Sequence, residues 1–125
     1  MISIKSRGDF EKTIKYLKKL SKRDVVGILD KYGQRGVELL SSATPVDTGK
    51  TSQMWSYEIN TKRGQYEINW TNNNVVNGVN IAMIIQYGHG TRNGGYVRGI
   101  DYINPVIKQV FNDMVEELRR EVSSE

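Results

Sequence analysis

The strongest structural signal in the sequence is a pair of alternating, aromatic-rich segments at residues 55–60 and 66–70. In both segments bulky apolar residues alternate with polar ones, and the apolar set is Trp55, Tyr57, Ile59, Tyr66, Ile68 and Trp70. A period of two is typical of strands with one buried face, and a four-residue turn at 61–64 would join them into an antiparallel hairpin. Because these aromatic side chains can bury a large apolar area, we predict that the hairpin anchors the core.

A basic amphipathic helix is predicted over residues 9–23. Asp9 is a suitable N-cap, and lysines occupy the side opposite the apolar residues. Those apolar residues recur at steps of three and four, and they are Phe10, Ile14, Leu17 and Leu20. The preceding residues 2–6 alternate weakly, so that either an edge strand or a disordered start is expected there.

A second helix is predicted to begin after Asp24 and to run to about Ala43. Three glycines, Gly27, Gly33 and Gly36, lie inside it. Each weakens a helix by ~1 kcal/mol relative to alanine, so their presence calls for a compensating contact. We therefore expect the glycine-bearing side to pack closely against a strand or a neighbouring helix.

Shorter elements connect these segments. Pro45 stops the second helix, and residues 46–51 are rich in turn formers. Residues 75–81 predict a third strand, which its asparagines and glycine make short or bulged. For residues 82–87 a helical turn is preferred to a strand.

The chain closes with an amphipathic helix that has Pro105 in its first turn and an apolar stripe extending to Val122. The predicted fold class is therefore α+β. A short antiparallel sheet with a long aromatic hairpin packs against two or three helices, and the last helix is the C-terminal amphipathic one. The 125 residues fit a single domain, residues 1–125.

Composition excludes several classes of protein. The chain has no cysteine, which removes disulfides, thiol nucleophiles and thiolate zinc sites and agrees with a reducing compartment. No run approaches ~18 apolar residues, and none follows the basic N-terminus. We expect neither a membrane span nor a secretory signal, and hence a protein made in the cytosol with no membrane partner.

The net charge of +4 is unevenly distributed along the chain. Residues 1–25 hold eight Lys or Arg against three acids, whereas residues 105–125 hold three against five. Opposite charges on one subunit suit a head-to-tail contact between copies. The simpler interpretation is two solvated faces of differing sign.

No constellation for catalysis is visible. His89 is the only histidine, and Asp101 is the only acid between Glu67 and Asp113, so a metal site would need distant carboxylates. The glycines at 88–99 lack the Gly-Lys-Ser/Thr ending of a phosphate loop, and the triplet that starts at Gly49 lacks its upstream glycine. We expect no enzymatic activity, no catalytic residue, no cofactor and no metal.

The glycine-rich segment at residues 88–99 reads as a surface loop with an interface composition. It carries Arg92, Tyr96 and Arg98, and arginines around an aromatic residue are common in protein interfaces. Lys62 and Arg63, in the predicted hairpin turn, are assigned to the same partner interface. The competing interpretation is a flexible loop in solvent.

Nucleic-acid binding is the rival function from the residues alone. Clustered lysines on the predicted helix at residues 9–23 would give a sequence-independent, salt-sensitive attraction to phosphates. Such a helix offers no readout of base edges, so we expect DNA binding by the isolated protein to be weak and unspecific. A basic nucleic-acid-binding module is accordingly kept as the alternative.

Two motifs carry a resemblance to a known family. They are Thr44–Gly49, with the sequence TPVDTG, and a segment with a Tyr-Gly pair and a threonine that leads to a proline-begun helix. Together they resemble the neck and tail-completion proteins of tailed bacteriophages, which include head–tail joining proteins and minor tail components. The likeness spans roughly residues 25–120. Its motif positions in this chain are Pro45, Asp47, Thr48, Gly49, Tyr87, Gly88, Gly90, Thr91 and Pro105.

The resemblance implies a structural subunit of a phage or prophage head–tail junction. Such subunits form rings, commonly hexamers, through which phage DNA passes, and they have no enzymatic activity and no cofactor. The implied partners are further copies of the chain, connector or stopper proteins, and tail-tube or terminator proteins. The implied location is the neck or tail of the virion, after assembly in the host cytoplasm. One departure is at Ile81, Ala82 and Gln86, where the family pattern has Tyr-Ala and then a glutamate.

Overall fold

The structure is a computed structural model that describes residues 2–6, 10–15, 21–45, 49–62 and 65–123. For residues 2–6, 10–15, 62 and 122–123 it describes the backbone alone. The main sheet is antiparallel, with strand order β1-β2-β4-β3. Its strands are β1 (Ile2–Ser6), β2 (Phe10–Lys15), β3 (Trp55–Lys62) and β4 (Gln65–Asn72).

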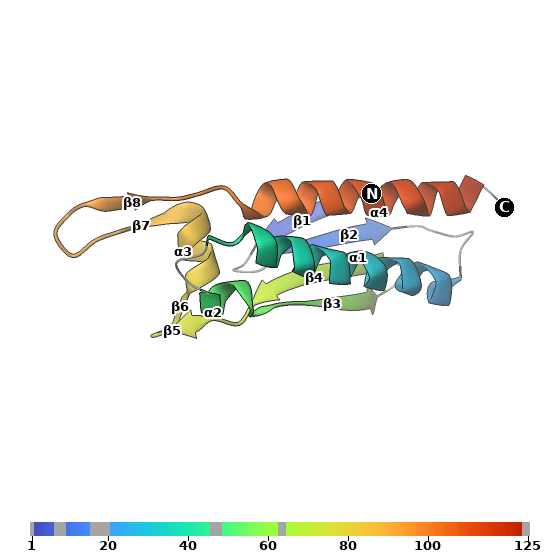
Figure 1. Ribbon diagram of the computed structural model, residues 1–125. Helices are drawn as coiled ribbons and strands as arrows, with labels where there is room; N and C mark the ends of the chain where they lie inside the picture. The colour runs from blue at the N-terminus through green and yellow to red at the C-terminus, as the bar shows by residue number, and fades with distance from the viewer. Residues whose placement is uncertain (1, 7–9, 16–20, 46–48, 63–64, 124–125) are drawn as a thin grey trace.

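Two long helices pack with this sheet. α1 (Lys22–Ala43) lies across β3 and β4, and α4 (Ile103–Ser123) runs beside α1 (Figure 1). The elements at one end of the molecule are short: α2 (Gly49–Ser52), β5 (Val75–Val76), β6 (Val79–Asn80), α3 (Ile81–Tyr87), β7 (Gly88–Gly90) and β8 (Tyr96–Arg98). The mixed α+β class with antiparallel strands and a C-terminal helix is therefore confirmed.

The aromatic hairpin is present and supplies the centre of the core. β3 and β4 pair antiparallel, with Tyr57 opposite Trp70 and Ile59 opposite Ile68. The strands reach Lys62 and Gln65, so the connection is shorter than predicted and its residues 63–64 lie outside the described part. Trp70 is fully buried, and its indole nitrogen donates to the Gly33 carbonyl oxygen over 3.0 Å.

Glycines of α1 explain how closely the helix lies on this hairpin. A Cβ at Gly33 would overlap the Tyr57 ring, and one at Gly36 would overlap the Trp70 indole. The packing face predicted from these two glycines is thus confirmed. Gly27 has no such neighbour within 4 Å and is exposed, so the prediction fails at that position.

The predicted basic helix at residues 9–23 is wrong at residues 10–15, and residues 9 and 16–20 lie outside the described part. Phe10–Lys15 forms β2, which lies between β1 and β4 in the sheet. In this strand Phe10 and Ile14 are the register partners of Trp70 and Tyr66. A spacing of four between two apolar residues fits a helix and a strand equally well. The segment is a strand because it pairs with both β1 and β4. α1 then begins after Ser21, whose hydroxyl oxygen accepts from the Asp24 backbone nitrogen.

The remaining predictions differ in outcome. Residues 75–81 do not form one strand. Instead, β5 and β6 make a minimal hairpin turned at Asn77 and Gly78, both with positive φ, and α3 starts directly after it. The helical turn preferred for residues 82–87 is confirmed as part of α3. The predicted turn at residues 46–51 is partly helical, since α2 begins at Gly49, and residues 46–48 lie outside the described part.

Candidate interaction surface

Exposed apolar side chains are concentrated at one end of the molecule. Every large hydrophobic residue that is strongly exposed in the described part of the chain lies between residues 75 and 100. The set is Val75, Val76, Val79, Tyr87, Tyr96, Val97 and Ile100. Scattered exposed apolar residues need no explanation, but a gathered set marks an interaction surface. We call residues 75–100 the apolar end.

The most prominent part of this end is a projecting hairpin, residues 88–98, which we call the arm. β7 and β8 pair antiparallel, with His89 opposite Val97 and Gly90 opposite Tyr96. The arm extends past the rest of the molecule (Figure 1). The segment predicted to be a loop is therefore a two-stranded ribbon. Its glycines allow the two strands to approach closely at the base and the chain to turn sharply at the tip.

The base of the arm is built from two glycines that touch. Gly88 has a φ of 81°, a left-handed conformation that favours glycine. A Cβ on Gly88 would overlap the backbone at Val97 and Gly99, and one on Gly99 would overlap the backbone at Gln86 and Tyr87. Side chains at either position would force the two chain segments apart. The pair therefore fixes the direction in which the arm leaves the body.

Two further hydrogen-bond sets hold the arm in shape. At the tip, the Thr91 backbone nitrogen donates to the Gly95 carbonyl oxygen over 2.9 Å, and the Gly95 nitrogen donates to the Thr91 hydroxyl over 3.0 Å. At the base, the Tyr96 hydroxyl donates to the Tyr87 carbonyl oxygen over 2.8 Å. The motif residues Tyr87, Gly88 and Thr91 thus share one task, which is to shape the arm.

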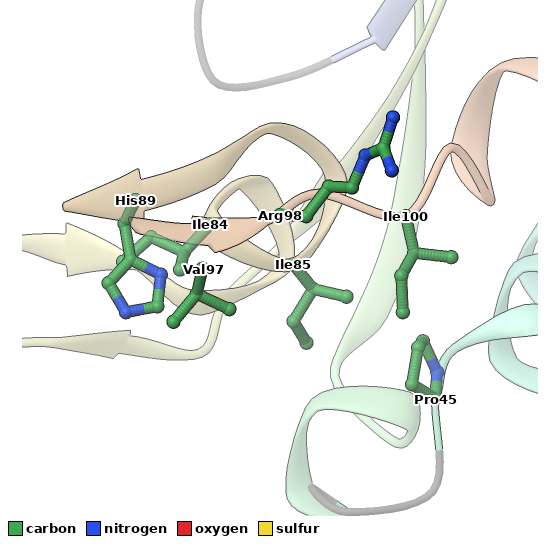
Figure 2. A pocket seen from close by; sticks show the side chains of 7 residues that line it. All are labelled: Pro45, Ile84, Ile85, His89, Val97, Arg98 and Ile100. Atoms are coloured by element: carbon green, nitrogen blue, oxygen red, sulfur yellow. The ribbon is translucent and has the colours of Figure 1, made fainter. Parts of the chain in front are cut away.

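A shallow apolar pocket of about 220 Å³ lies beside the arm base. Figure 2 shows Ile85 and Ile100 on the side of Pro45 and Val97 beside His89, whereas the Arg98 guanidinium points away from the other side chains. Ile84 and His89 complete the lining. The structure therefore brings Pro45 to the base of the arm, although the two are separated by about forty residues of sequence.

A buried amide joins the apolar end to the body. Gln86 is 5% exposed, and its Oε1 accepts from the backbone nitrogens of Tyr102 over 3.1 Å and Ile103 over 2.9 Å. Its Nε2 donates to the Asp101 carboxylate over 2.6 Å. A glutamate could accept the same two bonds but could not donate to Asp101. The departure from the family pattern at Gln86 is thus matched by Asp101, a pairing that only the structure reveals.

The predicted interface residues fall into two separate places. Arg92, Tyr96 and Arg98 all lie on the arm and are exposed, with Tyr96 at 66% exposure. Lys62 ends β3 at the other end of the molecule from the arm (Figure 1). Its side chain and Arg63 lie outside the described part. The structure therefore does not bring the hairpin turn and the arm together into one surface.

The motif positions are likewise divided. Gly90 belongs to β7 and Pro105 to the first turn of α4, as predicted for that helix. Gly49 starts α2 and is exposed with nothing within 4 Å of a Cβ. Asp47 and Thr48 lie outside the described part of the chain.

Within the described residues there is no group of His, Cys, Asp or Glu that could hold a metal ion. The helices of that same part of the chain include none with the length and apolar character needed to cross a bilayer. Comparisons of the chain with known protein families, curated proteins and solved structures find no match.

Proposed function

We propose that this protein is a structural subunit that assembles with copies of itself and with neighbouring rings at a phage or prophage head–tail junction. The observation that carries the proposal is the placement of all the strongly exposed large hydrophobic side chains of the described chain within residues 75–100. A protein that worked alone would gain nothing from presenting them together to water. A subunit of a larger assembly buries them against its neighbours.

The construction of the arm supports the same function. Its strands are three residues each, and residues 89–98 are all exposed, so the ribbon adds little to the core. An isolated ribbon of this size is at best marginally stable in water. Yet its base and tip are built from specific glycine and threonine contacts. Such a shaped but weakly supported element suits contact with a partner rather than stabilisation of the monomer.

The family resemblance gives the assembly its biological setting. In this chain the motif residues Tyr87, Gly88 and Thr91 shape the arm, and Pro45 lies at its base. These four of the positions that carry the likeness therefore lie at the candidate interaction surface. A hexameric ring in the neck or tail of a virion, with DNA passing through it, is the form of assembly that the resemblance favours.

The aromatic hairpin, whose turn carries the predicted interface residues Lys62 and Arg63, belongs to the body, because α1 packs across its apolar face. The projecting element is the arm. In the proposed mechanism the body keeps the frame rigid, and the arm and the pocket beside it meet the adjoining ring.

An infection complemented with an arm-shortened variant tests the proposal. Replacing residues 89–98 by a few Gly and Ser residues should leave the melting temperature nearly unchanged, while heads and tails accumulate separately in the lysate under the electron microscope. A matched control replaces the exposed Gln34 and Glu38 of α1 by alanine, and it should give joined particles. Joined, infectious particles at wild-type yield from the shortened variant would refute the proposal.

The alternative, a basic nucleic-acid-binding module, loses its main support. Its lysine-rich helix would have included Phe10–Lys15, which form a strand inside the sheet. Titration of the protein with duplexes of different sequence at physiological salt should show weak binding without sequence preference. Nanomolar, sequence-dependent affinity would instead make nucleic-acid recognition the main function.

A further inference from the structure

The arm carries positive charge that the rest of its own end does not balance. Arg92 and Arg98 are exposed, and neither forms an ion pair with a described residue. The sequence has no acid between Glu67 and Asp101, so the whole apolar end is free of carboxylates. Tyr96 and Arg98 lie two residues apart on one strand and therefore share a face of the ribbon. The arm thus presents an aromatic ring and guanidinium groups to a partner.

A surface of opposite charge lies on the outer face of the main sheet. Glu58 pairs with Asn69 and Glu67 pairs with Asn60 in the β3–β4 register, so both glutamates lie on the same face as diagonal neighbours. The opposite face holds Tyr57, Trp70 and their apolar neighbours beneath α1. Neither glutamate forms an ion pair with another described residue. Two neighbouring carboxylates disfavour each other and favour a cationic partner.

The surroundings of these glutamates suit a polar contact. The next row of the face is Ser56 and Thr71, whose hydroxyls lie 3.2 Å apart. A shallow pocket lined by Asn60, Thr61, Gln65 and Glu67 opens beside Glu67. Guanidinium groups bind carboxylates through paired, directional hydrogen bonds, and short polar side chains leave room for them. In the last row Gln65 lies between Lys62 and Lys15, so the end of the face at the turn is basic. The row of Asn69 lies between Glu58 and Glu11, so the acidic part is the middle of the face.

We propose that the arm of one copy docks on this outer sheet face of the next copy, with Arg92 and Arg98 against Glu58 and Glu67. The arm points away from its own body, so it is presented to another molecule (Figure 1). The two complementary surfaces are different parts of the same chain, and their contact is therefore heterologous and propagates into a closed ring or an open filament. The inference rests on the proposed self-assembly and names the surfaces that perform it.

A charge-swap experiment tests the docking directly. One variant reverses the arm, R92E with R98E, and the other reverses the sheet face, E58R with E67R. Either variant alone has like charges on both surfaces, and we expect at least about tenfold weaker self-association than wild type by analytical ultracentrifugation. A one-to-one mixture restores opposite charges at every contact, and we expect it to regain the wild-type oligomer. The fourfold variant should assemble by itself.

A matched control places the net-charge change of the arm-reversed variant away from both surfaces. K22E with K108E reverses two exposed lysines on α1 and α4. This control should assemble as wild type does, and thermal melts of all variants verify that the body stays folded. Added salt should weaken the wild-type oligomer, because the contact is between exposed charges.

The outcomes separate the docking from the assembly. If the arm-reversed variant still forms the wild-type oligomer, or if the mixture assembles no better than its components, the docking is wrong while self-assembly stands. A wild-type protein that remains monomeric at every concentration overturns both. Loss of DNA binding in the arm-reversed variant, with no recovery of assembly in the mixture, would identify the arm as a nucleic-acid contact instead.

Discussion

The body and the apolar end of this molecule use their side chains in opposite ways. In the body, the largest aromatic and aliphatic residues are buried, and polar groups such as Tyr32, Lys31 and Glu117 bond across α1 and α4. At the apolar end, comparable side chains face outward from elements of two to seven residues. The comparison indicates that stability depends on the body, and under the proposed function assembly depends on the apolar end. Substitutions should therefore affect one property without the other.

Replacing Trp70 by alanine should give the largest loss of stability. The indole is fully buried between α1 and the sheet, and its hydrogen bond to the Gly33 carbonyl would be lost with it. Removal of a buried aromatic side chain costs about 3–5 kcal/mol, so the thermal melt should shift by many degrees or the protein should fail to fold.

The matched change at the apolar end is Tyr96→Ala. Tyr96 is 66% exposed, and its hydroxyl bonds only to a carbonyl at the arm base. We expect the free energy of unfolding to change by no more than about 0.5 kcal/mol. A melt that shifts as much for Tyr96→Ala as for Trp70→Ala would contradict the division of the molecule into two regions.

The next largest loss of stability should come from adding one methyl group in the body. Gly36→Ala places a Cβ into the Trp70 indole, and overpacking of this kind costs about 1–3 kcal/mol. The same substitution at Gly27 meets nothing within 4 Å on an exposed part of the same helix, and there it should stabilise by about 0.5–1 kcal/mol. Chemical denaturation of both variants measures the difference. Equal effects at the two positions would show that helix propensity, and not close packing, governs both.

Replacing the amide nitrogen of Gln86 by oxygen should weaken the junction between the body and the apolar end. Gln86→Glu removes the donor to Asp101 and sets two carboxylates against each other, which we expect to cost about 1–2 kcal/mol near neutral pH. Adding Asp101→Asn should recover most of this loss, since the new amide can donate to the glutamate. A double-mutant cycle measures the coupling. No recovery in the double variant would mean that the cost arises elsewhere.

How much of this fold could be predicted from the sequence depends on how long each periodic pattern is. The hairpin and the last helix carry many residues in a single period, and both were predicted correctly as elements. Phe10 and Ile14 are four residues apart, a spacing that fits both a helix and a strand. The pairing with β4 shows that this segment is a strand, and β4 is distant in sequence. The β5–β6 hairpin turns on Asn77 and Gly78, a dipeptide signal that was present but was assigned to a bulge.

The candidate surface was predictable in its composition but not in its shape. Arg92, Tyr96 and Arg98 were identified from their residue types alone. Gly88 and Gly99 fix the arm base through backbone contact. This contact arises where two chain segments cross, and no local sequence pattern predicts such a crossing. The shared face of Glu58 and Glu67 was not predicted, because it follows from the strand register. Alternation within the hairpin was the available signal for them.

A pH-dependent effect is expected from a tyrosine that joins α1 to the sheet. The Tyr57 hydroxyl donates to the Asp30 carboxylate over 2.5 Å, and this bond, together with burial, raises the pKa of Tyr57 from its ordinary value of 10 to about 12. The folded state therefore keeps this proton at a pH where the unfolded state releases it. The stabilisation is fully present below pH 10 and is lost as the pH rises towards 12.

Tyr57→Phe tests this pH dependence. Near neutral pH it should cost no more than about 1 kcal/mol, because the bond lies near the surface. Between pH 10 and 12 its stability should fall less steeply than that of wild type, as measured by urea denaturation at each pH. Burial likewise raises the pKa of Tyr102 to about 12, so Tyr102→Phe gives the comparison for a tyrosine without a carboxylate partner. If wild type and Tyr57→Phe lose stability in parallel over this range, the Asp30 bond does not set the alkaline limit of the body.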